Sequence, residues 1–139
     1  MNSVEYIRKC ELNKSLDLEY RQYLTGHLQR KQPNLKHIDD DIEIGISYYK
    51  EFTADIPHVH PVATEHGYVL QGCVRMLVEN CDVEYQFNEG DFFVIRPGVG
   101  HASKNAPNTK VLFIKSPGIN DKKTIDVSDT LKQWLSSWE

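Results

Sequence analysis

The chain has 139 residues, of which 40% are hydrophobic and 26% are charged, and its formal net charge is −4. This length predicts one globular domain, and the acidic balance argues against nucleic-acid binding, which requires a basic face. No apolar stretch approaches the roughly 20 residues that span a bilayer, and no basic segment followed by an apolar run opens the sequence. The three cysteines, Cys10, Cys73 and Cys81, lack metal-type spacing and are interpreted as reduced thiols. We therefore expect a cytoplasmic protein that contacts neither a membrane nor nucleic acid.

The segment before residue 42 is predicted to hold a strand and a helix. Residues 4–12 are interpreted as the strand. Ser15 is a suitable N-cap for a helix that runs to about Gln29, because acidic residues and then apolar residues at three-to-four spacing follow it. The apolar stripe of this helix consists of Leu16, Tyr20, Tyr23, Leu24 and Leu28. Residues 31–33 end the helix, and residues 39–41 form an acidic turn.

From residue 42 the hydrophobic period changes to two, which predicts strands. Residues 42–49 indicate a half-buried strand whose apolar side consists of Ile42, Ile44, Ile46 and Tyr48. Further strands are expected around Val59 and over residues 68–70, 74–78, 83–87, 92–95 and 111–114, with turns at 79–82 and 88–90. So many short strands predict a β-sandwich or a β-barrel.

The end of the sequence returns to a helical pattern. Ser128 is a suitable N-cap, and one face of the predicted helix carries Leu131, Trp134, Leu135 and Trp138. Two exposed tryptophan rings would be unfavourable in water. We therefore expect this helix to pack against the β-structure or against a second subunit.

Four side chains in the strand region have the chemistry of metal ligands. His58 and His60 are two residues apart, Glu65 follows, and His101 lies further along the chain. Alternate side chains of a strand share one face, so both imidazoles of the pair can point into one cavity. Neutral imidazoles and a carboxylate suit one divalent ion such as Fe, Mn, Ni, Co or Zn. We predict that these four residues hold one such ion per chain, with His66 pointing to the opposite face.

The order and spacing of these ligands resemble the two sequence motifs of the cupin superfamily. The first motif is matched by His58, His60, Glu65 and Gly72, while Phe52 stands where the motif has its opening glycine. The second motif is matched by Gly90, Gly98, His101 and Asn105, while Arg96 replaces its first proline and Pro97 keeps the turn. The resemblance covers about residues 42–117.

The resemblance implies a mainly β fold, the double-stranded β-helix or jelly-roll barrel. We therefore predict a single domain over residues 1–139, with an N-terminal strand and helix extension over 1–41. The barrel core occupies 42–117, and a C-terminal tail and helix occupy 118–139. Cupin barrels commonly pair through a sheet face, so the resemblance also implies a homodimer.

Several further side chains are candidates for the substrate pocket and for catalysis. Gly67 and Val69 share the strand face of Glu65, and Ser103 shares that of His101. A glycine at position 67, where many cupins carry an aromatic residue, provides either space for a substrate or a bulge that relieves strand twist. Ser103 can hydrogen-bond a ligand, Tyr48 can donate a proton, and Arg75 can hold a carboxylate or a phosphate.

The predicted ligand set is compatible with three classes of function. An ion held by these ligands would act as a Lewis acid on a small polar metabolite. Cupins of this size include isomerases and epimerases of sugars and sugar nucleotides, and the resemblance makes this the reaction class that we prefer. The same ligands would also serve a mononuclear non-haem iron dioxygenase. A protein that binds or senses a small molecule without turnover is the third class.

Overall fold

The computed structural model describes residues 4–28, 32, 37–39, 41–79 and 83–139. The helices of this part are α1 (Lys9–Leu18) and α2 (Asp129–Leu135). The strands are β1 (Arg21–Thr25), β2 (Glu43–Tyr49), β3 (Thr53–Ala54), β4 (His58–Val59), β5 (Thr64–Gln71), β6 (Cys73–Val78), β7 (Glu84–Asn88), β8 (Phe92–Ile95), β9 (His101–Asn105), β10 (Thr109–Ser116) and β11 (Lys123–Thr124). The mainly β class, the N-terminal helix and the C-terminal helix are thereby confirmed.

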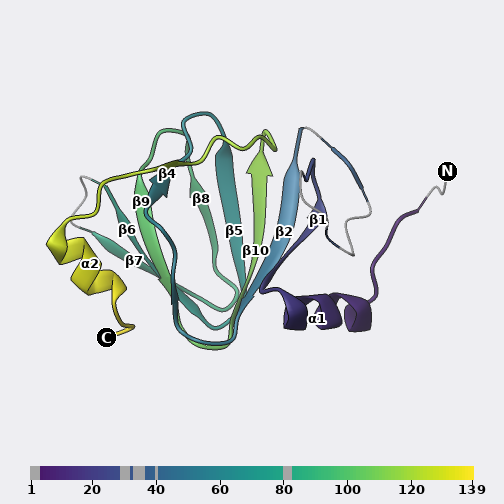
Figure 1. The fold of residues 1–139 in the computed structure, drawn as a ribbon, viewed down its shortest axis with the longest axis horizontal. Coiled ribbons are helices and arrows are strands. Elements are labelled where there is room, and N and C mark those ends of the chain that lie inside the picture. Colours follow the sequence, from purple (N-terminus) through teal and green to yellow (C-terminus); the bar gives the residue numbers. More distant parts are fainter. Residues whose placement is uncertain (1–3, 29–31, 33–36, 40, 80–82) are drawn as a thin grey trace.

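The strands form two antiparallel sheets that face each other (Figure 1). The first sheet has the order β1-β2-β10-β5-β8, and the second has the order β11-β4-β9-β6-β7, with β3 paired to β9. Strands adjacent in space are often distant in sequence, so residues from β4, β5 and β9 can meet between the sheets. Neither helix in the described part of the chain is long and apolar enough to cross a membrane.

The N-terminal helix is present, but its predicted bounds were wrong, and so was the strand predicted before it. The helix α1 begins at Lys9, inside the predicted strand, and the chain is extended again at Glu19. Ser15 lies within this helix, where its hydroxyl donates to the carbonyl oxygen of Glu11 (3.1 Å). The predicted helix is replaced from Arg21 by β1, because pairing with β2 satisfies the backbone of this segment. Gln29 and residues 31 and 33 lie outside the described residues.

The strand at residues 43–49 was predicted correctly, but its inner face was not. Gly45, Ser47 and Tyr49 are buried, and Ser47 and Tyr49 line the interior cavity, whereas the predicted apolar side was the alternate set, of which Ile46 alone is buried. The interior beside β2 is a polar-lined cavity, so burial there does not require an apolar side chain. Of the two predicted turns, 88–90 is present, and residues 80–82, with Cys81, lie outside the described residues. Cys10 and Cys73 are free thiols.

The apolar core lies between the two sheets. Its buried members are Tyr49, Val69, Val74 and Val111, with Phe87 and Phe93 packed against them. Next to this core, the first sheet alternates large and small residues across neighbouring strands. The ring of Phe93 fills the space above Gly67, and the ring of Phe113 fills the space above Gly45, its register partner. The two glycines therefore allow aromatic rings to lie flat on the sheet.

The C-terminal helix packs on the outside of the second sheet, as predicted (Figure 1). Ser128 caps it, because its side chain accepts from the backbone N–H of Leu131. The buried Lys104 of β9 donates to the carbonyl oxygens of Trp134 and Ser137, both at 2.8 Å, and its ammonium lies 4.3 Å from the centre of the Trp134 ring. A cation near the C-terminal end of a helix complements the helix dipole.

Candidate metal centre

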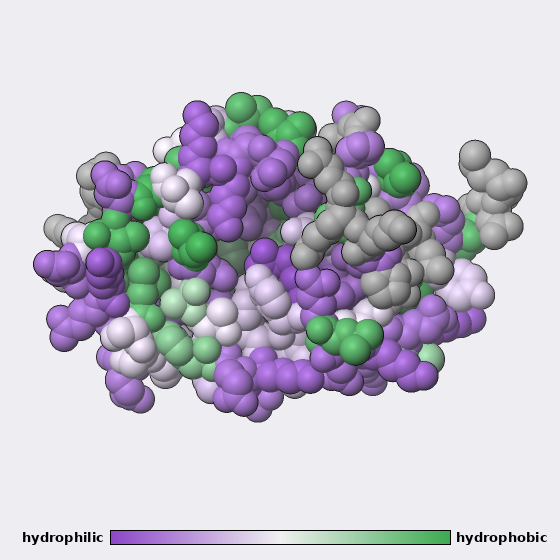
Figure 2. Space-filling model, viewed as in Figure 1, coloured by the Kyte–Doolittle hydropathy of each residue, from purple (hydrophilic) through white to green (hydrophobic). Residues whose placement is uncertain are grey.

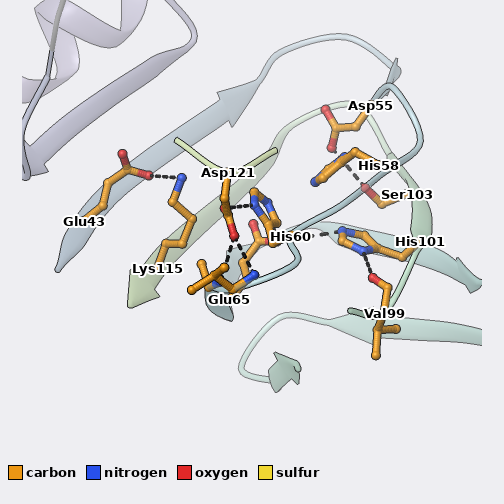
Figure 3. Close-up of polar contacts among 12 residues, drawn as sticks. Glu43, Asp55, His58, His60, Glu65, Val99, His101, Ser103, Lys115 and Asp121 are labelled. Atoms are coloured by element: carbon orange, nitrogen blue, oxygen red, sulfur yellow. Dashed lines mark hydrogen bonds and ion pairs between the residues drawn. The ribbon is translucent and has the colours of Figure 1, made fainter. Parts of the chain in front are cut away.

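The four predicted ligands converge at one end of the cavity between the sheets (Figure 3). One ligand atom each from His58, His60 and Glu65 lies within 4.8 Å of the other two. His101 joins this group, since its Nε2 is 3.8 Å from Oε2 of Glu65 and its ring centre is 4.5 Å from that of His58. The strand pairing explains this convergence, because His58 of β4 is the register partner of His101 of β9.

Each of the three imidazoles is held by an acceptor oxygen at Nδ1. The acceptors are the Ile56 carbonyl for His58 (2.7 Å), a carboxylate oxygen of Asp121 for His60 (2.8 Å) and the Val99 carbonyl for His101 (3.1 Å). An acceptor at Nδ1 favours the tautomer that carries its proton there, which leaves the lone pair on Nε2. This arrangement is the one that metal-binding histidines commonly have. The three Nε2 atoms are therefore available as ligands.

The carboxylate of Glu65 adds a specific sign of a cation site. Its Oε2 atom is buried and has no hydrogen-bond partner among the described residues. The Nε2 atoms of His60 and His101 each lie 3.8 Å from it, beyond hydrogen-bond distance. A buried carboxylate oxygen without a donor is unfavourable, and a bound cation would satisfy it. The donor set and this oxygen together fit a divalent metal ion.

Two groups of the site, His58 and Asp121, have lowered pKa values. The pKa of His58 is lowered to about 4: burial is the largest cause, His101, Lys122 and His60 act in the same direction, and the hydrogen bond to the Ile56 carbonyl opposes them. Burial alone would raise the pKa of Asp121, but the backbone N–H groups of Ala63 and Val62 and the His60 ring outweigh it. They bring the Asp121 pKa to about 2. Asp121 therefore stays ionised and keeps His60 oriented.

The cluster opens into a cavity of about 980 Å³ between the two sheets. Figure 2, drawn in the same view as Figure 1, shows a hollow near the middle of the surface. The apolar side of the cavity includes the rings of Phe93 and Phe113. Its polar side includes Asp55, whose Oδ2 accepts from the hydroxyl of Ser103 (3.0 Å). A cavity of this size, with both apolar and polar walls, suits a small organic molecule.

Residues that pair across neighbouring strands form rows that cross the sheet. An ion pair lies in the same row as Glu65. Lys115 is the register partner of both Glu65 and Glu43. Its ammonium is 3.4 Å from Oε2 of Glu43, and both side chains are largely buried against the cavity (Figure 3). The alternation from Val111 through Phe113 to Lys115 on β10 would have identified this lysine as facing inward. Sequence reasoning missed it because the predicted strand ended at residue 114.

Three of the predicted pocket residues occupy different environments. Ser103 lines the cavity. Gly67 also lines it, but the ring of Phe93 covers the space that a substrate was expected to use, and the β-bulge on this strand pair lies at Lys110 and Val111 rather than at Gly67. Val69 is fully buried in the apolar core and does not line the cavity.

Tyr48 and Arg75, the other two candidates for catalysis, are not brought to the cavity. The hydroxyl of Tyr48 contacts Asn108 (3.3 Å), on the face of β2 opposite Ser47. Arg75 lies on the outer face of the second sheet, where it donates to Glu84 and to the carbonyl oxygen of Trp138. Strand alternation separates both residues from the cluster.

The histidine adjacent to Glu65 points away from the cluster. The ring of His66 stacks on that of Phe92, with ring centres 6.1 Å apart, on the opposite face of β5. This placement agrees with the alternation expected along a strand. Asp121 is the residue of the site for which the sequence gives no signal, because it lies in the tail that follows the strand pattern.

The fold and the site define a small β-barrel protein with a polar cavity and a candidate metal centre at one end of it. A family model described as Cupin matches residues 54–138. The chain therefore belongs to the cupin family, which confirms the resemblance inferred from the two motifs. A search of curated proteins finds no match.

Solved structures with a similar fold confirm the barrel type. A Klebsiella pneumoniae protein with a double-stranded β-helix domain is 19% identical, with a TM-score of 0.56 over 63% of this chain and 77% of that one. KdgF from Halomonas is 24% identical, with a TM-score of 0.53 over 60% and 74% of the two chains. The DMSP lyase DddQ from Ruegeria pomeroyi is 21% identical, with a TM-score of 0.55 over 69% and 45%. At these identities the likeness shows the fold alone.

Proposed function

We propose that this protein is a metal-dependent enzyme that acts on a small polar metabolite in the barrel cavity. The buried Oε2 of Glu65 carries this proposal, because it has no hydrogen-bond partner among the residues that the structure describes and faces the Nε2 atoms of His60 and His101. His58 completes the ligand set. An unsatisfied buried acceptor costs about 1–3 kcal/mol, and a cation bound here would remove that cost.

The residues around the proposed ion have separable roles. When bound, a divalent ion such as Fe, Mn, Ni, Co or Zn supplies Lewis-acid stabilisation of negative charge on a substrate oxygen. Asp121 and the carbonyl oxygens of Ile56 and Val99 orient the three imidazoles. The aromatic walls of the cavity limit the access of water to the bound molecule.

Isomerisation or epimerisation is the reaction class that we propose. Such reactions move a proton to and from a carbon atom, and they need an acid or base beside the ion. The ion pair of Lys115 and Glu43 lies in the row of Glu65 and is the proton-transfer group that we assign to this role. Ser103, which lines the opposite wall, is assigned to binding the substrate.

Dioxygenation at a mononuclear iron ion is the second candidate, because three imidazoles and one carboxylate also suit iron(II). Structurally similar chains include the DMSP lyase and an oxalate decarboxylase from Bacillus subtilis, so enzymes occur on this fold. At 21% and 16% identity, these two leave the reaction to be argued from the cavity of this chain.

The reaction class is tested with purified protein loaded with each candidate metal. The protein is incubated with small hydroxy- and keto-acids and sugars in D₂O, and deuterium incorporation is followed by NMR while an electrode records dissolved oxygen. We expect deuterium exchange at carbon without oxygen uptake, and loss of the exchange in Lys115→Met. Substrate-dependent oxygen uptake would establish the dioxygenase instead, and ligand binding without exchange or uptake would establish a binding protein.

We also propose that the protein is a homodimer. Four large apolar side chains of β5 and β8 lie on the outer face of the first sheet, with exposed fractions from 37% to 60%: Tyr68, Leu70, Phe92 and Val94. They are neighbours, since Tyr68 and Phe92 are register partners and the others follow at alternate positions. Burying this face against a second copy would remove it from water.

A further inference from the structure

A second polar feature of the cavity is the guanidinium group of Arg21, on β1. Its Nε donates to the hydroxyl of Ser47 (2.9 Å), and its Nη2 donates to the hydroxyl of Tyr49 (3.1 Å). The Arg21 Cζ atom lies 5.2 Å from the centre of the Tyr20 ring and 5.3 Å from that of the Phe113 ring. Two hydrogen bonds to the neighbouring strand β2 and two aromatic rings hold the guanidinium in one orientation.

The charge of this arginine has no ion-pair partner in the described part of the chain. Both of its hydrogen-bond acceptors are neutral hydroxyls, and burial raises the pKa of the Tyr49 hydroxyl to about 12, so that it stays protonated. Asp55 lines the same cavity, and its negative charge favours the charged form of Arg21 from a distance, but its Oδ2 accepts from Ser103 and forms no direct ion pair with the guanidinium. A guanidinium has five N–H donors, and two are used. A cation at a partly enclosed site is unfavourable unless an anion compensates it.

The geometry of the remaining donors is specific. Ser47 and Tyr49 occupy the edge of the guanidinium that contains Nε. The other edge, formed by Nη1 and Nη2, is a fork that matches two coplanar oxygen atoms. The rings of Tyr20 and Phe113 lie near the guanidinium, which favours approach of a ligand in its plane. A planar carboxylate fits this fork, whereas a phosphate dianion would call for a second cation, and the cavity's Lys115 is paired with Glu43.

We propose that Arg21 binds the carboxylate of the cavity's ligand, so that the substrate of this protein is a small carboxylic acid. This inference rests on the proposed function only in naming that ligand as a substrate. The residue row of Arg21 includes Val69, through Ser47 and Val111. Val69 is four residues from Glu65 on β5, which separates the two rows by about 13 Å at the usual rise of a strand. Arg21 and the four candidate metal ligands line the same cavity, so a ligand held at Arg21 by its carboxylate has to span this distance to reach the candidate metal centre.

The experiment measures binding rather than turnover. Butyrate is titrated into the protein and its affinity is measured by NMR. Butyramide serves as the uncharged molecule of the same shape, and inorganic phosphate serves as the non-planar anion. The same titrations are made with the double variant His58→Ala, His60→Ala, which lacks the proposed metal ligands. We expect butyrate to bind both proteins equally and more tightly than butyramide or phosphate.

Variants at position 21 then locate the binding site. Arg21→Gln should weaken butyrate binding by about tenfold or more, because a charge-assisted double hydrogen bond is lost. Arg21→Lys should weaken it less, since the charge remains but the fork does not. The control is Arg8→Gln, an exposed arginine that lies on the ring of Tyr6, and it should bind butyrate unchanged.

Several results would overturn the proposal. These are wild-type affinity in Arg21→Gln, equal binding of butyramide, tighter binding of phosphate, or failure of the wild type to bind butyrate. Should Arg21→Gln fail to fold, wild-type affinity in Arg21→Lys would overturn it equally. Loss of butyrate binding in the double histidine variant would place the carboxylate on the metal instead. A wild type that carries no metal but binds butyrate through Arg21 would refute the metal proposal and leave this one standing.

Discussion

Each histidine of the candidate metal centre depends on one oxygen atom that accepts a hydrogen bond at Nδ1. Two of these oxygens are the backbone carbonyls of Ile56 and Val99, which remain in place when the side chains of these residues are substituted. The third belongs to Asp121, which also accepts from the backbone N–H groups of Val62 (2.9 Å) and Ala63 (2.8 Å). Asp121 therefore couples the tail after β10 to the orientation of His60.

Replacing Asp121 by alanine should weaken metal binding by roughly 10- to 100-fold, the usual effect of losing a residue that orients a metal ligand. His60 would keep its imidazole but lose the acceptor that fixes its proton on Nδ1. Affinity is measured by competition with a coloured chelator. Asp126→Ala, in an exposed position of the same tail, is the matched control. Equal affinity in both variants would show that Asp121 does not position the ligand.

The pKa of His58 predicts how the stability of the metal-free protein depends on pH. The folded-state pKa is about 4, below the ordinary value of 6.5, so the unfolded chain takes up this proton at a higher pH than the folded chain. Stability should therefore fall as pH decreases from 6.5 toward 4. The ring is partly exposed and solvent screens the effect, so we expect a loss on the order of 1 kcal/mol between about pH 7 and about pH 5. Urea unfolding at both pH values measures this loss, which should shrink in His58→Gln; the same dependence in that variant would assign it to other groups.

At the scale of elements, most of the longer barrel strands could be predicted, because they have a period of two and a turn signal at an end. The strand β9 was missed, since its sequence of His101, Ala102, Ser103, Lys104 and Asn105 has no apolar alternation. Its inner side faces a polar cavity, and on its outer side Lys104 is covered by α2. The bounds of the N-terminal elements were predicted wrongly because the spacing from Leu16 to Leu24 fits one helix. Pairing with β2 imposes a strand on the second half of this segment.

The candidate site was predictable to the extent that its residues lie in the two motifs. The type and spacing of four residues identify them as candidate ligands, and the structure brings these four together: His58, His60, Glu65 and His101. Residues that act through tertiary contacts, such as Asp121 and Arg21, have no local pattern that identifies them. Asp121 reaches His60 across 61 positions of the chain. Only the path of the tail over the barrel brings these two side chains together.

The pairing of glycine and aromatic residues on the first sheet leads to a prediction about position 67. A methyl group there would overlap the ring of Phe93, so Gly67→Ala should lower the free energy of unfolding by about 1–3 kcal/mol. The same change should cost less in a Phe93→Leu protein, where the smaller side chain leaves room for the methyl group. The double variant is therefore compared with Phe93→Leu alone. Chemical denaturation of the four proteins forms a double-mutant cycle. Strictly additive effects would mean that Phe93 does not occupy the space above Gly67. The larger change Gly67→Phe should be more destabilising still.

At the scale of the whole molecule, the apolar surfaces decide how copies of the chain associate. The tryptophans of the C-terminal region are not available for this purpose, because Trp134 and Trp138 pack on Lys104 and Arg75 of the second sheet. The outer face of β5 and β8 remains exposed. A dimer formed there would leave the cavity and the candidate metal centre on the inner side of each barrel.

Light scattering of the wild type should return twice the 16.1 kDa of a single chain. The double variant Leu70→Lys, Phe92→Lys should return a single chain, because two buried charges on each subunit would oppose association. Val4→Lys, which changes an exposed apolar residue outside the barrel, should leave the dimer intact. A wild type of 16.1 kDa, or a double variant that stays dimeric, would refute an interface on this sheet face.

The metal content of the purified protein tests the central claim most directly. Elemental mass spectrometry should find about one divalent transition-metal ion per chain in the wild type. The double variant His58→Ala, His60→Ala should contain almost none, whereas His66→Ala, whose ring points to the opposite face of β5, should keep the full content. A wild type without metal, or equal metal content in the wild type and the double variant, would contradict the assignment of this site.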